Sequence, residues 1–427
     1  MRIIADFHLH SAFSRATSRD MHLPEIARWG RLKGLSLLGT GDFTHPAYFQ
    51  EIRTQLEETG KGLLRLKGGK ADDPLFILTA ETSHIYTQGG KGRRIHMMIF
   101  APGMAAAEKI NLRLGALGNV KSDGRPIFGF SAKDLVKVVL DIEPACLLVP
   151  AHVWTPWFSV FGSQSGFGSL EECFEEETAH IFAIETGLSS DPAMNWRWSA
   201  LDNLTLISNS DAHSPAKIGR EANIFETELS YPAIIEAIKQ KDPTRFPATI
   251  EFFPEEGKYH FDGHRNCRVC FSPGQSRENN DCCPVCGKKI VIGVMHRVEE
   301  LADRPPGFRP PGAISAIHLV PLEEIIAAGY GLGAGSKRVR REYLNLLERG
   351  GAELEILLDK SAAELTSFMD SRLVEGILRV RQGLVAVHPG YDGVYGRVTL
   401  FSEDPAEKQA LSPPADRQLN LFKGGTL

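Results

Sequence analysis

The sequence predicts an α/β protein whose N-terminal part is a barrel of alternating strands and helices. Short apolar runs alternate with amphipathic stretches from residue 1 to about residue 245, such as LPEIARWGRLKG, SAKDLVKVVLDI and YPAIIEAIKQ. Acidic and imidazole side chains stand at the ends of apolar runs, among them MRIIADFHLH, LFILTAE and CLLVPAH. This alternation is typical of an α/β barrel, in which the C-terminal ends of the strands converge on one face.

Nine polar side chains that are far apart in the sequence are therefore expected to meet at that face. They are His8, His10, Asp42, His45, Glu81, His96, His152, Asp211 and His213. Imidazoles and carboxylates gathered in one place are ligands for several divalent metals. We therefore predict an active-site metal centre.

The spacing of these residues suggests individual roles. Residues two apart on a strand point to the same side, so His8 and His10 are expected to bind together, and Asp211-Ala-His213 repeats that spacing. Glu81 is the expected bridging carboxylate, because a negative bridge reduces the repulsion between two neighbouring cations.

Other positions leave alternatives open. His96 and His152 could be hydrogen-bonded core histidines, although the neighbouring ligands favour metal binding. Asp42 and His45 both follow the run GLSLLGTG, and either could be the ligand.

Such a centre would lower the pKa of bound water and clamp the attacking and leaving oxygens of a displacement at phosphorus. The direct inference is a hydrolytic phosphoesterase, since no Ser-His-Asp or reactive-cysteine arrangement competes with it. The predicted catalytic residues are His8, His10, Asp42, Glu81, Asp211 and His213.

Five of the seven cysteines lie between residues 267 and 286. Cys267-x2-Cys270 and Cys283-Pro-Val-Cys286-Gly have the spacing of a tetrahedral, structural zinc site. Cys282 is the extra thiol, and Cys283 is preferred because CPVCG supplies the proline and glycine of a knuckle turn. The ribbon could be a structural staple or could also contact DNA.

The chain of 427 residues is long for one domain. We predict a catalytic barrel (1–250), a four-cysteine zinc ribbon (251–303), a helical DNA-contacting domain (304–400) after the Pro-rich joint RPPGFRPPG, and a flexible tail (401–427). No secretory signal or membrane span is evident, so a cytoplasmic monomer without membrane contact is expected.

Local basic residues suggest where phosphate could bind, although the net charge is −5. Arg15, Arg94 and Lys217 are candidates for holding the scissile phosphate. The segment GYGLGAGSKRVRREY places glycines before a basic helix, so Ser336, Lys337 and Arg338 could contact the DNA backbone.

The motifs HLHS, GTGD, AETSH, PAH and SDAH resemble those of the PHP (polymerase and histidinol phosphatase) superfamily. This resemblance implies a distorted seven-stranded β/α barrel with up to three metals, here two to three of Zn²⁺, Mn²⁺ or Mg²⁺. Members usually carry a further ligand several residues after the HxH motif. Ala16 and Thr17 fill those places here, which puts the third metal in doubt.

The stretches HSAFSRATSRDM, WTPWFSVFGSQSGFGSLEECF and SDAHSPAKIGREANIFETELSY, followed by a cysteine ribbon, are similar to endonuclease Q. That resemblance covers about residues 1–395. It implies nicking of double-stranded DNA on the 5′ side of deaminated bases (uracil, hypoxanthine, xanthine) and of abasic sites. Chemistry on such a base favours extruding it from the helix, and Phe7, residues 162–168 and residues 195–197 are candidate pocket segments.

Two other functions would explain part of the sequence. A small-molecule phosphatase of the same superfamily accounts for the metal centre but leaves the ribbon and helical domain unexplained. A non-catalytic DNA-binding scaffold is disfavoured by the nearly complete set of ligands.

The tail contains a short peptide with apolar anchors in a polar context. Gln418, Leu419, Leu421 and Phe422 resemble the peptide that binds the bacterial sliding clamp. The clamp is therefore a predicted partner, and chance similarity is the alternative.

Overall fold

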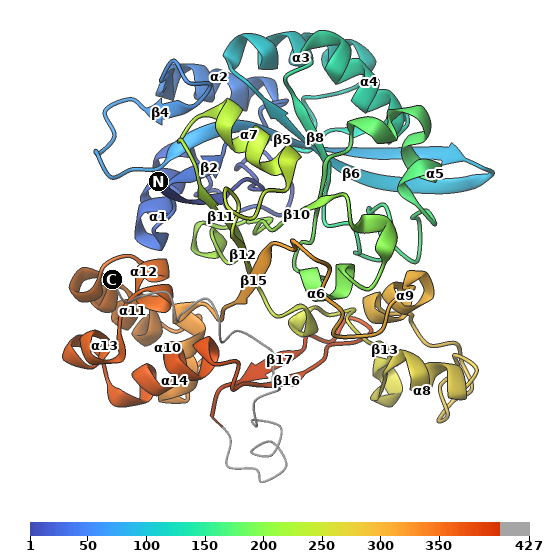
Figure 1. The fold of residues 1–427 in the computed structure, drawn as a ribbon, viewed down its shortest axis with the longest axis vertical. Coiled ribbons are helices and arrows are strands. Elements are labelled where there is room, and N and C mark those ends of the chain that lie inside the picture. The colour runs from blue at the N-terminus through green and yellow to red at the C-terminus, as the bar shows by residue number, and fades with distance from the viewer. Residues whose placement is uncertain (402–427) are drawn as a thin grey trace.

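A computed structural model of the protein describes residues 1–401, and its centre is one large mixed sheet (Figure 1). The sheet has eleven strands. Along its main path they are β15 (Ser315–His318), β12 (Ala248–Glu251), β11 (Ala222–Glu226), β1 (Arg2–Asp6), β2 (Leu37–Gly39), β5 (Leu75–Gln88), β4 (Leu64–Leu66) and β3 (Leu56–Glu58). Off this path, β6 (Lys91–Ala101) pairs with β5 and with β8 (Leu147–Pro150), and β7 (Ile127–Phe128) pairs with β5.

A separate parallel pair is formed by β9 (Ala183–Glu185) and β10 (Thr205–Ile207). Asn209 and Asn223 connect it to the sheet through their side chains. The amide oxygen of Asn209 accepts from Phe7 N, and that of Asn223 accepts from Ser208 N. The mixed α/β class is therefore confirmed, whereas the distorted seven-stranded barrel stays a prediction.

Helices cover the outside of the sheet (Figure 1). They are α1 (Leu23–Lys33), α2 (Pro46–Gln55), α3 (Met104–Leu117), α4 (Ala132–Ile142), α5 (Leu170–Phe174), α6 (Pro192–Asn195) and α7 (Tyr231–Gln240). The amphipathic stretches read from the sequence form α1, α4 and α7. Helix α4 begins where predicted because Ser131 and Asp134 form a capping box.

Strand β5 is longer than its apolar run. It continues to Gln88 because it pairs with β6 along the whole hairpin, from Leu78 opposite Ala101 to Gln88 opposite Lys91. Gly89 and Gly90 form the turn with φ of 60° and 73°, values that suit a two-residue hairpin turn. Glu81 consequently lies inside a strand and not at its end.

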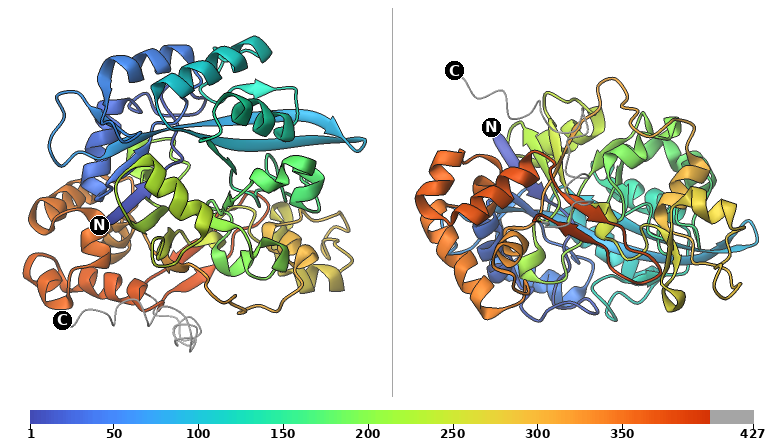
Figure 2. Two further views of the ribbon diagram at one scale, coloured as in Figure 1. Left: turned by 45° about the horizontal axis from the view of Figure 1, so that its top comes forward. Right: turned by 90° about the horizontal axis from the view of Figure 1, so that it is seen from below.

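The ribbon and the helical domain lie on different sides below the barrel, as the two further views also show (Figure 2). The ribbon contains β13 (Asp262–His264), β14 (Val269–Phe271) and α8 (Pro273–Glu278), and α9 (Val294–Leu301) follows it. The helical domain contains α10 (Leu322–Tyr330), α11 (Lys337–Gly350), α12 (Glu353–Leu358), α13 (Ala362–Phe368) and α14 (Ser371–Arg381). The hairpin of β16 (Ala386–His388) and β17 (Arg397–Thr399) comes last.

One strand lies on the other side of a predicted boundary. Strand β15 falls in the range assigned to the helical domain, yet it pairs in parallel with β12, Ala248 opposite Ser315. The sheet of the barrel therefore extends to His318, and the ribbon is an insertion between two of its strands. Among residues 1–401, none of the helices combines the length and apolarity that crossing a lipid bilayer requires.

Candidate metal centre

The structure brings six of the nine predicted active-site ligands into two neighbouring groups. One group is His8, His10 and Asp211, and the other is Glu81, His96 and His152. Within each group the possible ligand atoms lie within 4.8 Å of one another. The five residues other than Asp211 are buried. Segments from β1, β5, β6, β8 and β10 thus meet as the strand pattern predicted.

Glu81 lies between the two groups. Its Oε2 is 3.2 Å from His10 Nε2 and 3.5 Å from His8 Nε2. Its Oε1 is 2.7 Å from His96 Nδ1 and 3.2 Å from His152 Nε2. One carboxylate oxygen faces each group, which is the arrangement a bridging ligand needs.

Three buried atoms of the first group suit a cation. His8 Nε2, His10 Nε2 and Asp211 Oδ1 have no hydrogen-bond partner among the described residues. Asp211 Oδ1 is 3.1 Å from His10 Nε2 and 3.7 Å from His8 Nε2, so the three atoms converge. Buried polar atoms left without partners are costly, and a divalent cation would satisfy all three.

A carboxylate behind each imidazole of the HxH pair fixes the orientation of its ring. His8 Nδ1 lies 3.0 Å from both oxygens of Glu185, and His10 Nδ1 lies 3.1 Å from Asp42 Oδ1. A carboxylate at Nδ1 leaves Nε2 free for a metal and raises its basicity. Glu185 also accepts from His152 N and from the Asn209 amide, so this buried carboxylate holds three parts of the site together.

The carboxylates dominate the electrostatics of the site. Burial would lower the pKa of His8, but Glu185, Glu81 and Asp211 outweigh it and raise that pKa well above its ordinary value. Burial would raise the pKa of Glu81, but His96 and Arg125 hold it well below the ordinary range. The carboxylates around His8 therefore favour positive charge at that position.

Asp42 and His45 are in neither group. Asp42 Oδ2 accepts hydrogen bonds from Ser11 N, Ser11 Oγ and Ser14 Oγ, and its Oδ1 faces His10. Asp42 therefore orients the imidazole of His10, and the structure does not place Asp42 itself among the possible metal ligands. His45 caps α2, where its Nδ1 accepts from Tyr48 N, and its ring stacks on Phe13 at 4.7 Å.

His213 lies beside the first group without joining it. Its ring centroid is 4.4 Å from that of His10, and its Nδ1 is 2.9 Å from the carbonyl oxygen of Asp211. Burial and the neighbouring His10 lower the pKa of His213, which favours a neutral ring.

Arg125 is a site residue that the sequence analysis missed. Its Nη1 donates to Glu81 Oε2 at 2.9 Å. Burial opposes the charge of the guanidinium, but Glu81 and Asp211 outweigh it and raise the pKa of Arg125. The preceding Gly124 allows the loop to approach, since a Cβ there would lie 2.3 Å from Asp42 Oδ2. The structure thus places a permanent positive charge at the edge of the metal centre.

Backbone strain is concentrated at the site. Asp42, His152 and Asp211 have φ of 50°, 28° and 47°, in the left-handed region that side chains rarely adopt. Such conformations cost of order 1–3 kcal/mol each and persist where the surroundings enforce them. Three of them in one centre indicate that the ligand geometry is maintained at the expense of stability.

The ribbon forms a second possible metal site with a different ligand set from the predicted one. His264, Cys267, Cys283 and Cys286 place their ligand atoms within 4.8 Å of one another, and Cys270 is not in this group. After Cys267 the chain continues into β14, where Cys270 lies opposite Gly263 of β13. The segment from Cys267 to Cys270 therefore does not form the turn of a zinc knuckle. Only the second knuckle has its glycine, Gly287 with φ of 71°.

The thiols of the ribbon differ in how readily they ionise, since burial raises the pKa of Cys267 to about 11. Burial opposes ionisation, but backbone N–H groups of Cys286 and Val285 lower the pKa of Cys283 to about 6. Thiolates are the form that binds zinc. The cysteines outside the ribbon, Cys146 and Cys173, are buried as expected.

The predicted phosphate-binding residues differ in their surroundings. Arg15 is 75% exposed and pairs with Asp123 at 3.2 Å. Arg94 lies over the ring of Phe158 at 5.7 Å, next to the centre. Lys217 pairs with Glu324 of α10 at 3.3 Å, so it also joins the barrel to the helical domain.

The glycine loop leads into α11 as predicted. Ser336 is the N-cap of this helix and accepts from Val339 N, so its hydroxyl is engaged within the protein. Lys337 and Arg338 lie on the first turn, and the Arg338 guanidinium lies 5.4 Å from the ring of Tyr330. These two basic side chains are available to a phosphate backbone.

The three candidate base-pocket segments are largely structural. Phe7 is fully buried between Phe100 and Phe225. The loop of residues 162–168 is fastened by arginines, since Arg297 donates to the carbonyl oxygen of Phe167 at 3.0 Å. Asn195 is buried and accepts from Trp154 Nε1 at 2.8 Å.

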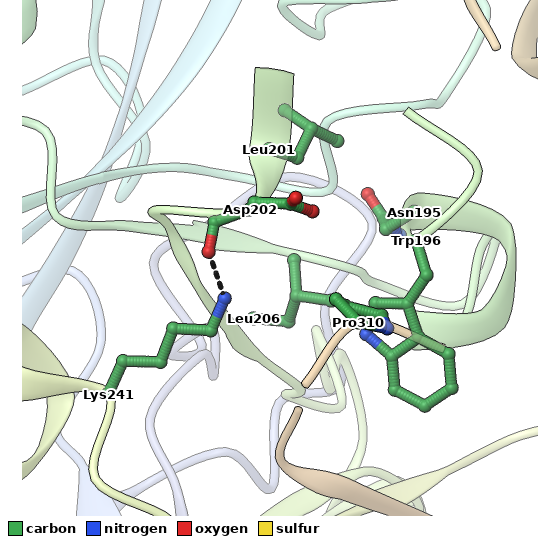
Figure 3. A pocket seen from close by; sticks show the side chains of 7 residues that line it. All are labelled: Asn195, Trp196, Leu201, Asp202, Leu206, Lys241 and Pro310. Carbon is green, nitrogen blue, oxygen red and sulfur yellow. Dashed lines mark hydrogen bonds between the residues drawn. The ribbon is translucent and has the colours of Figure 1, made fainter. Parts of the chain in front are cut away.

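Asn195 and Trp196 also line a small pocket (Figure 3). The other residues around it are Leu201, Asp202, Leu206, Lys241 and Pro310, and Lys241 bonds the carbonyl oxygen of Asp202 across one side. No metal-ligand group of the described residues borders it. The predicted clamp-binding residues Gln418, Leu419, Leu421 and Phe422 lie outside the described residues.

Comparison with solved structures gives two matches over nearly the whole chain. The crystal structure of the lesion-specific endonuclease PfuEndoQ from Pyrococcus furiosus matches with a TM-score of 0.83 and 28% identity, covering 97% of this chain and 100% of that one. Endonuclease Q in complex with a 27-mer duplex that has an abasic lesion at the active site matches with a TM-score of 0.82 and 29% identity. That match covers 94% of this chain and 98% of the other.

Sequence comparisons agree with the structural ones. Protein YqxK of Bacillus subtilis is 28% identical over 411 residues, which are 93% of this chain and 99% of YqxK. Protein MJ0043 of Methanocaldococcus jannaschii is 33% identical over 260 residues, but the match spans only 31% of that longer protein. The family model of the MJ0043 C-terminal domain matches residues 321–384, the helical domain. The resemblance to endonuclease Q noted in the sequence is confirmed along nearly the full chain.

Proposed function

We propose that this protein is a metal-dependent DNA repair endonuclease that hydrolyses the phosphodiester on the 5′ side of deaminated bases and abasic sites. The observation that carries the proposal is the pair of ligand groups whose histidines Glu81 faces with one oxygen each, within a chain that matches endonuclease Q over nearly all its length. A substrate of that neighbour, duplex DNA with an abasic lesion, supports duplex DNA as the partner.

The ligands divide between two cation positions. His8, His10 and Asp211 would hold one cation, His96 and His152 the other, and Glu81 would bridge them. Divalent cations held there supply an activated water at neutral pH and neutralise charge on the phosphate. Glu185 and Asp42 keep the Nε2 atoms of His8 and His10 directed into the pocket.

Arg125 would hold the scissile phosphate. Its guanidinium has further N–H donors besides the one on Glu81, and a planar fork matches two phosphate oxygens. His213 at the rim, whose lowered pKa favours a neutral ring, is a candidate to accept a proton from the attacking water. Lys337 and Arg338 would contact the DNA backbone further away, and the tail peptide Gln418–Phe422 would tether the enzyme to a sliding clamp.

The number and kind of bound cations follow from the ligand sets. Imidazole and carboxylate ligands suit Zn²⁺ or Mn²⁺, and the described residues form two active-site groups and not three. The ribbon would hold one structural Zn²⁺ through His264, Cys267, Cys283 and Cys286. We therefore propose two active-site cations and one in the ribbon.

Duplexes that carry a single uracil, hypoxanthine, xanthine or abasic position test the function. Labelling each strand end in turn should show one break immediately 5′ of the lesion, with no break in the undamaged duplex. Asp211→Asn should show none. Hydrolysis of small phosphate monoesters without any nicking would favour a phosphatase, and lesion binding without either reaction would favour a scaffold.

A further inference from the structure

The turn that carries the possible metal ligand Asp211 has an unusual backbone conformation. Asp211 has φ of 47°, in the left-handed region that residues other than glycine rarely adopt. Its Oδ1 has no hydrogen-bond partner among the described residues and converges with the Nε2 atoms of His8 and His10. A strained conformation persists only where its surroundings enforce it, so the peptides on either side of Asp211 are expected to be held by other groups.

The peptide that follows Asp211 is joined to the segment that carries the HxH pair. Ala212 N donates to His8 O at 3.3 Å, and His10 N donates to Ala212 O at 3.0 Å. Leu9 and Ala212 thus form a parallel bridge outside the named strands. The bridge fixes the chain after Asp211, and the peptide before Asp211 needs a separate anchor.

The guanidinium of Arg220 anchors the peptide before Asp211. Arg220 Nε and Nη2 donate to the carbonyl oxygen of Ser210 at 3.0 Å and 2.9 Å. Two donors from one rigid, planar group leave the carbonyl oxygen little freedom. Because the peptide unit between Ser210 and Asp211 is planar, the direction of this carbonyl is coupled to φ of Asp211.

A buried carboxylate holds the same turn from the other side. Asp6 is fully buried, and its Oδ1 accepts from Ser210 N at 3.1 Å while its Oδ2 accepts from Ser210 Oγ at 2.6 Å. Asp6 Oδ2 also accepts from Gly219 N at 2.9 Å. Gly219 has φ of 72° and directly precedes Arg220, so the same carboxylate helps to place the arginine. Ser210 is therefore fixed at its N–H, its hydroxyl and its carbonyl oxygen.

We infer that Arg220 and Asp6 are positioning residues for the cation that the Asp211 carboxylate would bind. The side chain of Arg220 bonds Ser210, and that of Asp6 bonds Ser210 and Gly219. Both act on Asp211 through the backbone and direct its carboxylate toward the two imidazoles of the HxH pair. This inference rests on the proposed function, because it takes the first ligand group to hold a divalent cation.

The effect of this anchor should be confined to one cation position. A carboxylate that already points at its neighbouring ligands loses little conformational freedom when a cation binds. Without Arg220, the peptide before Asp211 could turn toward an ordinary backbone conformation and carry the carboxylate away. The second ligand group, which contains His96 and His152, takes no residue from this turn. Its cation should therefore be bound as in the wild type.

The test is a Mn²⁺ titration of the full-length protein without DNA, in which free Mn²⁺ is measured by electron paramagnetic resonance. Arg220→Met should weaken one active-site position by about 10- to 100-fold, the usual effect of removing a group that orients a metal ligand. The other position should keep its affinity. Arg220→Lys should lie between this variant and the wild type, because an ammonium can donate to the Ser210 carbonyl oxygen but lacks the planar pair of donors.

Anomalous diffraction from crystals soaked in Mn²⁺ identifies the position that is affected. The Mn²⁺ concentration is set from the titration, so that it saturates both positions of the wild type but not the weakened position of the variant. Arg220→Met should then keep the peak beside His96 and His152 and lose the peak beside Asp211. Loss of the other peak instead would contradict the inference.

Two further variants keep the test decisive. Ser210→Ala removes the hydroxyl that bonds Asp6, and it should weaken the same position by a smaller factor if Arg220→Met does not fold. Arg245→Met is the matched control, because Arg245 Nη2 donates to the carbonyl oxygen of Ala233 in α7, and its loss should change neither affinity. Wild-type affinity in Arg220→Met, or equal weakening of both positions, would overturn the inference.

Nicking of an abasic duplex at several Mn²⁺ concentrations separates this inference from the proposed function. Arg220→Met should need about 10- to 100-fold more Mn²⁺ for its half-maximal rate and should approach the wild-type maximum. A deficit that saturating Mn²⁺ does not relieve would contradict a role through the cation. If the wild type binds Mn²⁺ but nicks nothing, the proposed function fails and the titration still decides the role of Arg220. If the wild type binds no Mn²⁺, both fail.

Discussion

The active-site metal centre and the ribbon site are built in opposite ways. The six ligands of the centre come from positions 8 to 211, and all but Asp211 are buried. The four ligands of the ribbon come from positions 264 to 286, and Cys286 is exposed. A site assembled from many strands depends on the whole fold for its geometry, whereas a local site needs only its own turns.

The surroundings of the ligands differ as well. In the centre, Glu185 and Asp42 stand behind imidazoles, Arg125 faces the bridging carboxylate, and two of the six ligands, His152 and Asp211, have strained backbones. In the ribbon, the groups that support Cys283 are mainly backbone N–H donors. Under the proposed function, the centre would hold the reacting cations and the ribbon a structural one, so removal of ligands should have different consequences.

Glu81→Gln should have the greatest consequence. The amide keeps the shape but removes the charge that separates the two cation positions, so nicking of an abasic duplex should fall by at least about 10³-fold. Zinc in the ribbon should be retained. The exposed Glu108→Gln is the matched control, and activity of the Glu81 variant near that of the control would contradict a bridging role.

Arg125→Ala should reduce the maximal nicking rate by about 10²-fold, the usual cost of removing one donor from a developing charge. Arg125→Lys keeps the charge but not the planar fork, and should recover only part of the loss. The cation content should be unchanged in both. Loss of bound cation in parallel with activity would make Arg125 a structural residue, and the exposed Arg113→Ala serves as control.

The ribbon ligand set gives a smaller and purely structural effect. His264→Ala should lose about one zinc ion per chain, measured by elemental analysis after gel filtration, whereas Cys270→Ser should keep it. The active-site cations should be unaffected by either. Zinc loss from Cys270→Ser with retention in His264→Ala would restore the four-cysteine set expected from the spacing.

The weakest of these effects concerns stability and depends on pH. Glu221 and Glu251 lie opposite each other, one step beyond the pair of Ala222 and Ile250. Burial raises the pKa of Glu251 from its ordinary 4.5 to about 8, despite the hydrogen bond from Thr249. The unfolded chain releases this proton at lower pH than the folded chain, so stability should fall as pH rises from 4.5 to about 8.

Melting temperatures measured at about pH 5.5 and about pH 8.5 test the expected loss of stability, because most of the range from pH 4.5 to about 8 lies between these two values. Glu251→Gln cannot ionise, so its melting temperature should fall less than that of the wild type between these two values. The exposed Glu228→Gln should behave as the wild type does. Identical declines in all three proteins would show that the proton on Glu251 does not contribute.

The sequence could predict the parts of the centre that follow strand periodicity. His8, His10, His96 and His152 adjoin apolar runs, and Glu81 faces the same side although its strand continues past it. Glu185 also stands at the end of a short apolar run, FAIE, so the same strand pattern could have identified it as a site residue. The His45-Pro46 pair was a helix-start signal, which is the role His45 has.

Other features could not be read from periodicity. Arg125 lies in a loop without any strand pattern, and it reaches Glu81 only because Gly124 allows the backbone to pass Asp42. Asp42 was correctly placed near the centre. Whether such a carboxylate coordinates the metal itself or hydrogen-bonds a metal-binding histidine depends on distances of a few ångströms. The ribbon shows the same limit, since the pairing of β13 with β14 decides between Cys270 and His264.

Anomalous diffraction from crystals soaked in Mn²⁺ decides whether Glu81 bridges two cations. Two peaks about 3.5–4 Å apart are expected, one on each side of the Glu81 carboxylate, the first contacting His8, His10 and Asp211 and the second contacting His96 and His152. A single peak away from Glu81, or no bound ion at either group, would contradict the bridged centre.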